Sequence, residues 1–448
     1  MVSCGPMNLS VWVITPFVLM LASIAVAPLV PRASRLWERN GVKFAVAMVL
    51  GLPTAVAVCV LDSPALVVNS LEEYGEFIVL LASLFVVSGG IFLQGDLRAT
   101  PRNNVLLLAI GGVLASFIGT TGAAMLMIRP LLNTNRQRQH KVHTVIFAIF
   151  IIANCGGLLT PLGDPPLYIG LMRGVPFAWT LSLTPQWLFI NGLLILTYWG
   201  LDHHFHAQES EFALAWDEAS RTPLKLRGGL NIVWFLAIIA SVAFLGEIVW
   251  LKVLVQIGAA AASYFLTDKK TRFEDNEFTW SPIVEVAVLF LGIFLTMVPA
   301  LEYLRANAHL LPLNEYTFFG FTGALSSVLD NAPTYLTFFE MGTQMPGDSL
   351  VAGVPSLYLT AISLGAVTCG AITYIGNGPN FMVKAVAEER GIVMPSFGRY
   401  VVWALRYLFP VLVAMVCLFI SPVLWVKLVG AAITVLIVTR SLIQILRR

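Results

Sequence analysis

The stretch Ala153 to Leu171 reads ANCGGLLTPLGDPPLYIGL and places one carboxylate, Asp164, among glycines and prolines inside an otherwise apolar run. A second stretch repeats its pattern 213 residues later. The shared pattern T-x-[LI]-G-[DN]-x-P aligns Thr160, Gly163, Asp164 and Pro166 with Thr373, Gly376, Asn377 and Pro379. Since Gly and Pro weaken helices, two breaks in corresponding places indicate paired, unwound membrane helices in a two-fold repeated chain.

Composition excludes an ordinary soluble protein. Of the 448 residues 58% are hydrophobic and only 12% are charged, and the mean hydropathy is +0.82. A globular domain usually has about a quarter of its residues charged, and many apolar runs here are long enough to cross a bilayer. The lipid bilayer is therefore the expected partner, with no nucleic acid, because no basic patch occurs. The five cysteines follow no CxxC or zinc spacing.

These features predict an all-α polytopic membrane protein with about 11 transmembrane helices plus two re-entrant hairpins, arranged as inverted-topology repeats with broken helices. The first repeat is expected at residues 1–201, with a hairpin at about 104–128 and a broken helix at about 143–168. A cytoplasmic linker follows at 202–229, then a second, inverted repeat at 230–420 with a hairpin at about 314–341 and a broken helix at about 354–384, and residues 421–448 form a final helix and a basic tail.

The placement of Lys and Arg sets the expected orientation, because these residues gather in cytoplasmic loops. Arg35, Arg39 and Lys43 follow the first span, which puts the N-terminus outside, while Asp62 to Glu76 has no base and is expected to be an external loop. The first hairpin then enters from the cytoplasm and the second from outside. The C-terminus is cytoplasmic, and the expected location is a bacterial inner membrane.

Oxygen-bearing side chains gather at the breaks and hairpin tips. Asp164 and Asp330 are the deepest carboxylates, and intramembrane carboxylates usually face a cavity, a partner or an ion. The remaining candidates are Asn154, Thr160, Thr373, Asn377 and Asn380 at the breaks and Thr120, Thr121, Asn331 and Thr334 at the hairpins. Oxygen ligands suit a hard cation, so Asp164 and Asp330 are expected sodium ligands. A proton can compete for the same carboxylates, because burial favours their neutral form.

Simpler interpretations remain open for each feature. A Gly/Pro break can be a structural kink, and a deep carboxylate can pair with a structural donor. Glu285 and Glu340 lie near predicted membrane boundaries and are expected on solvated faces. Leu162-Gly163-Asp164 partly matches the G-x-G-D motif of intramembrane aspartyl proteases, but Pro161 replaces the first Gly. No enzyme is therefore expected.

Three motifs, GDPP at 163–166, LDNAP at 329–333 and GNGPN at 376–380, resemble the ion transporter superfamily. This superfamily includes D-type sodium/proton antiporters, ArsB/P-protein-like permeases and CitMHS-type citrate transporters. The resemblance covers nearly the whole chain and implies that Asp330 and Asn331 line the site from a hairpin tip. It also implies possible homodimers. This chain departs from many relatives at Leu167, where they have Asn, and in the GTTG tip at 119–122.

The leading hypothesis is a secondary active transporter, a sodium/proton antiporter working by alternating access. The sodium ion and the proton are the expected transported or coupling ions, and no other cofactor is expected. The alternative is a sodium- or proton-coupled transporter of citrate or another small organic anion, which the half-helix N-termini at the breaks would hold. Arsenite export is a third option.

Overall fold

The computed structural model describes residues 11–37, 39–219, 223, 225–245 and 248–446. Residues 9 and 10 of the predicted first span, residues 220–222 and 224 of the predicted linker, and residues 447 and 448 of the basic tail lie outside the described residues. Within these limits, seven helices are long and apolar enough to cross a membrane, and four shorter apolar helices accompany them. The predicted all-α polytopic fold is confirmed.

The part of the chain predicted to be the first repeat runs from η1 to α9. Its opening helices are η1 Val11–Ile14, α1 Thr15–Val26, η2 Ala27–Leu29, α2 Pro31–Trp37, α3 Asn40–Leu61 and α4 Pro64–Ser88. A helical hairpin, a broken helix and a long helix follow as α5 Pro101–Ile118, α6 Thr120–Thr134, α7 Val142–Ile151, η3 Cys155–Leu158, α8 Pro165–Met172, η4 Phe177–Leu183 and α9 Thr184–His206.

The second repeat follows the same plan. Its opening helices are α11 Asn231–Phe244, α12 Val249–Leu266, η5 Lys270–Asp275, α13 Ser281–Asn307 and η6 Ala308–Leu310. The hairpin, the broken helix and the closing helices are α14 Glu315–Ser326, α15 Asn331–Gly342, α16 Ser356–Cys369, η7 Gly370–Ile372, α17 Gly378–Glu389, α18 Phe397–Tyr407, α19 Phe409–Met415 and η8 Val416–Ile420, before the final helix α20 Leu424–Leu446.

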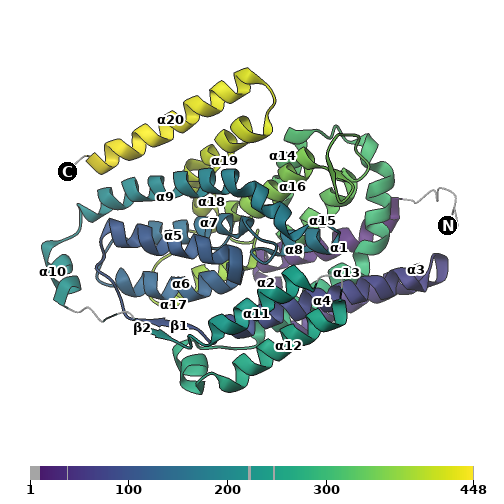
Figure 1. The fold of residues 1–448 in the computed structure, drawn as a ribbon, viewed down its shortest axis with the longest axis horizontal. Coiled ribbons are helices and arrows are strands. Elements are labelled where there is room, and N and C mark those ends of the chain that lie inside the picture. Colours follow the sequence, from purple (N-terminus) through teal and green to yellow (C-terminus); the bar gives the residue numbers. More distant parts are fainter. Residues whose placement is uncertain (1–10, 38, 220–222, 224, 246–247, 447–448) are drawn as a thin grey trace.

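Short elements complete the chain. They are the linker helix α10 Glu211–Ala219 and the strands β1 Phe92–Gln94, β2 Lys225–Arg227, β3 Leu350–Val351 and β4 Val354–Pro355. β1 pairs with β2 in antiparallel register, with Phe92 opposite Arg227. The linker is thereby hydrogen-bonded to the chain that leaves α4, which connects the two repeats at one end of the molecule (Figure 1).

Two predicted boundaries are wrong. The expected external loop from Asp62 to Glu76 is the first half of α4, which begins at Pro64 after the N-cap Ser63. The acids of this stretch are helix residues. Glu76 is paired inside the bundle with Lys252 (Oε2 to Nζ, 2.6 Å). The expected linker start at residue 202 also lies within a helix, because α9 continues through a buried Asp202 to His206.

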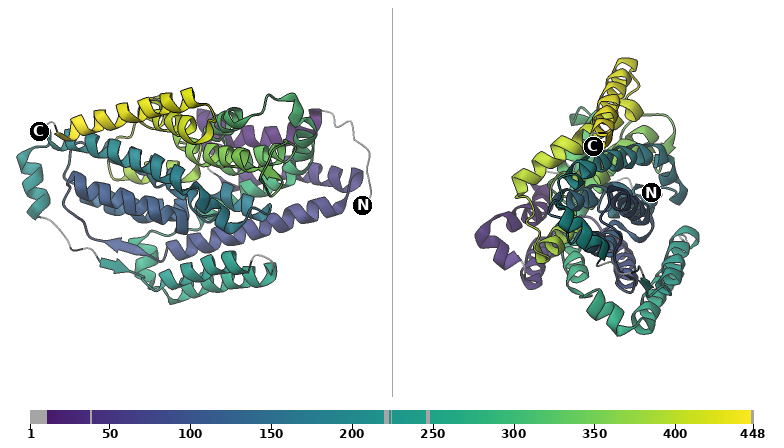
Figure 2. Two further views of the ribbon diagram at one scale, coloured as in Figure 1. Left: turned by 45° about the horizontal axis from the view of Figure 1, so that its top comes forward. Right: turned by 90° about the vertical axis from the view of Figure 1, so that its left-hand side faces the viewer.

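The helices form two packed groups. We call α1, α3, α4, α11, α12 and α13 the frame, because they pack mainly on one another, and α5–α9 with α14–α19 the core. The frame lies along the lower side of Figure 1. The two hairpins approach the centre of the core from opposite ends of the molecule. Figure 2 shows the core and α20 covering one side of the frame.

A pseudo-two-fold relation is visible in direct contacts. The Tyr74 hydroxyl on α4 donates to the carbonyl of Ala287 on α13 at 2.9 Å, and these residues are 213 positions apart, the same spacing as the two breaks. Symmetry-related residues touch each other only beside the axis that relates them. An axis that relates the two predicted repeats would therefore pass through the α4–α13 crossing.

Candidate functional site

The N-termini of four helices converge at the centre of the core. They belong to α6 and α15, the second helices of the two hairpins, and to α8 and α17, the second halves of the broken helices. Each hairpin tip is docked on an unwound segment. In the first repeat the Thr120 N–H donates to the Gly163 carbonyl at 2.8 Å, and the tip residue Gly119 has φ +80°, a conformation that glycine adopts readily. Helix N-termini carry partial positive charge, which suits the acidic groups found there.

The repeated glycines permit close backbone crossings. A Cβ on Gly163 would lie 2.0 Å from the Gly157 carbonyl oxygen, and a Cβ on Gly376 would lie 2.5 Å from that of Gly370. In both repeats the chain folds back on itself over six residues. The glycine of T-x-[LI]-G-[DN]-x-P is thus required by the fold at each break.

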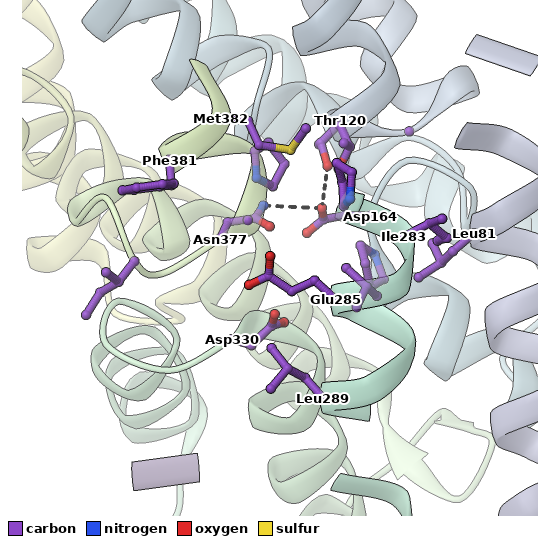
Figure 3. A pocket seen from close by; sticks show the side chains of 18 of the residues that line it. Leu81, Thr120, Asp164, Ile283, Glu285, Leu289, Asp330, Asn377, Phe381 and Met382 are labelled. Atoms are coloured by element: carbon purple, nitrogen blue, oxygen red, sulfur yellow. Dashed lines mark hydrogen bonds between the residues drawn. The ribbon is translucent and has the colours of Figure 1, made fainter. Parts of the chain in front are cut away.

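Asp164 lies at the convergence point and is only 2% exposed. Its Oδ1 accepts from the Thr120 hydroxyl at 2.8 Å and from Asn377 Nδ2 at 3.5 Å, while its Oδ2 accepts from Asn331 Nδ2. These donors come from both hairpins and from the other broken helix, and Figure 3 shows Thr120 and Asn377 beside Asp164. Asp164 therefore connects the two repeats through hydrogen bonds from uncharged donors.

The amides of the two broken helices also interlock. Asn154 Nδ2 donates to Asn380 Oδ1 at 2.7 Å, and Asn377 Nδ2 donates to the Ala153 carbonyl at 3.1 Å and to Asn154 Oδ1 at 3.2 Å. Asn380 in turn donates to the carbonyls of Gly370 and Thr373. This buried network fixes the crossing of the two unwound segments.

Asp330 is held differently. It is the N-cap of α15, where its Oδ1 accepts from the Ala332 N–H at 3.1 Å, and it is partly exposed to the cavity described below. The neighbouring Asn331 is buried, and its Oδ1 has no hydrogen-bond partner among the described residues. Because Asn331 must turn its NH₂ group toward Asp164, its oxygen is left as a free acceptor. Asn331 thus supplies an oxygen atom without a donor, and no ion pair involving a base is seen at the Asp330 carboxylate among the described residues.

The predicted threonines fall into two groups. Thr160 donates to the Ser116 carbonyl and Thr373 to the Ser327 carbonyl, so both tie a break to a hairpin. Thr334 donates to the Asp330 carbonyl within α15. Thr120 and Thr121, in contrast, line the cavity. The structure therefore brings Thr120, Thr121, Asp164, Asp330 and Asn377 to the cavity surface.

A cavity of about 740 Å³ extends from the convergence point to the end of the molecule where α3 and α13 begin and α17 ends (Figure 3). Its lining carries four acidic side chains, Asp164, Glu285, Asp330 and Glu388, and two basic ones, Lys43 and Lys384. Both bases are already paired, Lys43 with Glu285 at 2.6 Å and Lys384 with Glu388 at 3.2 Å. The two central aspartates remain uncompensated, so the cavity has an acidic interior.

Sequence reasoning missed Glu285 and Lys43. Glu285 was expected on a solvated face, and its side chain is indeed 43% exposed, but it faces the cavity and is held by a buried lysine. The available signal was a lone Lys near the start of one apolar helix and a lone Glu near the start of another, and only the fold shows that these helices lie side by side.

At the opposite end of the molecule, the pairs Arg305–Glu340 and Glu73–Arg173 join the frame to the core, and the contact between Arg173 and Glu340 lies within the core. Glu340 on α15 is bound by Arg305 of α13, and Arg173, just after α8, lies 3.6 Å from Glu340 and 3.0 Å from Glu73 of α4. Glu340 is only 2% exposed. Its predicted place on a solvated face is therefore wrong, because two arginines cover it.

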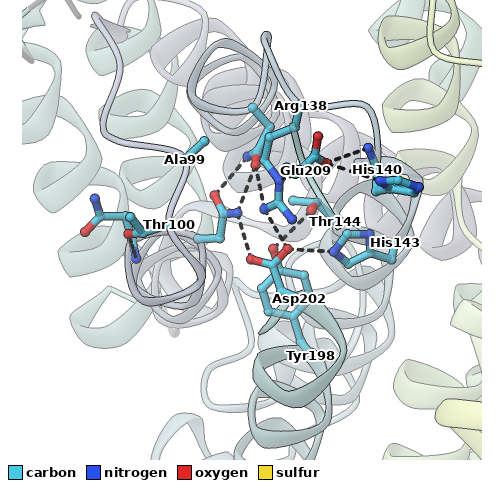
Figure 4. Close-up of polar contacts among 12 residues, drawn as sticks. Ala99, Thr100, Arg138, His140, His143, Thr144, Tyr198, Asp202 and Glu209 are labelled. Atoms are coloured by element: carbon cyan, nitrogen blue, oxygen red, sulfur yellow. Dashed lines mark hydrogen bonds and ion pairs between the residues drawn. The ribbon is translucent and has the colours of Figure 1, made fainter. Parts of the chain in front are cut away.

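A second buried polar network lies at the base of the first hairpin (Figure 4). Asp202 Oδ1 is 2.7 Å from Arg138 Nη1 and 2.8 Å from His143 Nε2, and Asn104 Nδ2 donates to its other oxygen. Unlike Asp164, this carboxylate is neutralised by a buried arginine. It therefore joins α5, α7 and α9 and leaves no free ligand for an ion.

Glu209, after α9, belongs to the same network, because it lies 3.6 Å from Arg138. Burial by itself would raise the pKa of Glu209, but hydrogen bonds from the backbone N–H groups of Gln139 and His140 and the charge of Arg138 outweigh it, so the pKa lies below the ordinary value. The carboxylate is thus kept ionised as an anchor for the hairpin base. Among the described residues, no three His, Cys, Asp or Glu side chains gather as a metal cluster.

Comparison with known proteins adds a family and two relatives. A model of the family described as "Putative citrate transport" matches residues 6–420. The chain is 25% identical over 314 residues to an uncharacterized transporter of Mycobacterium tuberculosis and, with the same values, to one of Mycobacterium bovis. Each match covers 66% of this chain and 71% of the relative.

Proposed function

This chain belongs to the family described as "Putative citrate transport" and is an integral membrane transporter, not an enzyme. We propose that it exchanges a cation, most simply sodium, for protons at Asp164 and Asp330. The observation that carries the proposal is the acidic cavity, in which both lysines are paired and the two central aspartates are not. A carboxylate in such a place stays charged only with a bound cation, and otherwise takes up a proton. That choice between cation and proton couples their movements.

The mechanism follows from the hydrogen bonds. Asp330 faces the cavity, so a cation that enters the cavity can reach this carboxylate, and the free oxygen of Asn331 lies buried behind it. Asp164 is linked to both hairpins and to the other broken helix through Thr120, Asn331 and Asn377. Charge neutralisation at these carboxylates lowers the cost of moving the core past the frame, and alternating access follows when only the neutralised core crosses.

Orientation is part of the proposal. The cavity opens at the end that carries Lys43, Lys384 and Arg390, and basic residues mark the cytoplasmic side. The structure then represents an inward-open state, with the C-terminus in the cytoplasm of a bacterial cell and the Glu340 ion pairs closing the external side. A homodimer remains the expected assembly.

A second candidate is cotransport of a small organic anion with the cation. The cavity of about 740 Å³ lies within the usual range for small-molecule sites, and four helix N-termini face the centre. The acidic lining means that a tricarboxylate such as citrate would enter only together with cations.

Transport in proteoliposomes distinguishes these functions. For the antiporter, a sodium gradient drives a pH change that Asp330→Asn and Asp164→Asn each reduce at least tenfold, while Glu76→Gln, outside the cavity lining, retains it. Sodium-dependent uptake of labelled citrate, with no sodium-driven pH change in its absence, would favour the second candidate. Full exchange by Asp330→Asn would refute the assigned role.

A further inference from the structure

The Lys43–Glu285 pair belongs to the frame, whereas Asp164, Asp330 and Asn377 belong to the core. Lys43 is the fourth residue of α3 and is 3% exposed, and its Nζ contacts Glu285 Oε1 at 2.6 Å. Figure 3 shows the Glu285 carboxylate pointing into the cavity near Asp330 and Asn377. The pair therefore presents its negative member to the cavity and keeps its positive member buried in the wall.

We propose that the Lys43–Glu285 pair sets the electrostatic potential of the cavity, and that Glu285 is a specificity-determining residue that favours cations approaching the central aspartates. Its carboxylate is water-exposed and acts through the cavity, whereas the lysine charge is held behind it. The proposal deepens the proposed cation exchange and rests on it. Glu285 does not need to touch the cation, because one unit charge several ångströms away acts through water.

The frame contains a matched pair outside the cavity. Lys252 is the fourth residue of α12 and binds Glu76 of α4 at 2.6 Å. As in the Lys43–Glu285 pair, the lysine is buried and the glutamate is more exposed. Glu76 and Lys252 are absent from the residues that line the cavity. If such pairs only join frame helices, Glu285 and Glu76 are equivalent. If Glu285 sets the potential of the cavity, they differ.

The charges that face Glu285 come from every wall of the cavity. They are Lys43 of α3, Asp164 before α8, Asp330 before α15, and Lys384 and Glu388 of α17. Lys384 is engaged with Glu388. A change at Glu285 or Lys43 therefore alters the charge of the cavity lining by one unit, and no unpaired base lies among these residues to offset it.

The direct test measures the potential at a reporter cysteine. Met382→Cys on the cavity wall is labelled in everted vesicles, in a background without reactive native cysteines, with methanethiosulfonates that are either cationic or anionic but otherwise similar. Relative to the parent, Glu285→Gln should slow the cationic reagent and speed the anionic one by about threefold each, so that the ratio of the rates falls about tenfold. Lys43→Met should raise the ratio, and Glu76→Gln should leave it unchanged.

Transport then tests specificity. In the same vesicles Glu285→Gln should raise the KM for sodium about three- to tenfold, Lys43→Met should lower it, and the double variant should lie near the parent. A merely structural pair would give two single variants with the same sign. Equal labelling ratios in all variants, or a changed ratio without a changed KM, would overturn the proposal. The variants could instead change the ratio of labelling rates as expected while the protein shows no sodium-driven pH change. That result would refute the proposed exchange and leave the electrostatic role of the pair established. If Lys43→Met does not fold, the comparison of Glu285→Gln with Glu76→Gln decides.

Discussion

Replacing Glu340 by Gln should open the external side of the transporter more often. Glu340 of the core contacts both Arg305 of the frame and Arg173 of the core, at the end opposite to the cavity. Glutamine keeps the shape of the side chain but removes its charge. Because frame and core must separate at this end for the external side to open, the substitution destabilises the closed arrangement and not the open one.

The free-energy cost of Glu340→Gln in the closed arrangement depends on how exposed the ion-pair partners are. Removing one member of a fully buried ion pair costs about 3–5 kcal/mol, whereas fully exposed pairs contribute about 0–1 kcal/mol. Glu340 is buried, but the Arg305 side chain is 49% exposed and that of Arg173 is 26% exposed. An intermediate value of about 2 kcal/mol corresponds to about a 30-fold increase in the outward-open population.

A cysteine at Ile169 reports this population. Ile169 is buried on α8 and lies 213 residues before Met382, the cavity-lining residue used above, so the inverted repeat places it on the wall of the external cavity when that side opens. Labelling of Ile169→Cys from outside by an impermeant maleimide should accelerate about 10- to 30-fold in Glu340→Gln. Glu388→Gln, which removes an acid from the other end, is the control. An unchanged rate, or equal acceleration in the control, would refute the idea that the Glu340 ion pairs hold the external side closed.

Two further predictions concern stability. Asp202→Asn removes the nearer counter-charge of the buried Arg138, which then keeps only Glu209 at 3.6 Å. The change should cost about 3 kcal/mol, the lower end of the range for a broken buried pair, seen as a lower thermal unfolding midpoint in detergent; Arg138→Met combined with Asp202→Leu should recover most of it, and a single variant as stable as the parent would show that the pair is not a structural anchor. Gly163→Ala places a Cβ 2.0 Å from a carbonyl oxygen and should abolish the yield of folded protein, whereas Gly192→Ala, where nothing lies within 4 Å, should fold normally; equal yields would contradict the close crossing.

Features that depend on local chemistry were predictable from the sequence. The two breaks are visible because Gly and Pro interrupt apolar runs, and the hairpin tips because Gly119 and Asp330 sit at the turning points that the structure shows. The inverted order of spans followed from the positions of Lys and Arg. These signals lie within short stretches of chain, so they survive without knowledge of the fold.

Features that depend on partners distant in the sequence were not predictable. Glu340 looked like a solvated acid until Arg305 and Arg173 were found around it. Asp202 looked like the start of a linker, although it lies beside Arg138 at the base of a hairpin. A charged residue in an apolar helix signals that a partner exists, and only the packing of helices identifies that partner.

The two repeats differ in charge because the axis that relates them passes close to the site. Asp164 and Asn377 occupy equivalent positions and lie within 3.5 Å of each other, where two carboxylates would repel and could not both stay ionised. One acid and one amide can share a hydrogen bond instead. The second acid stands at the hairpin tip, where Asp330 takes the place that Gly119 holds 211 residues earlier. Glycine at the first tip allows its φ of +80°, while Asp330, with φ −58°, can cap α15 and face the cavity. Two acids are thereby kept near one centre without direct contact, which the duplication of a single acidic position on the axis would not have allowed.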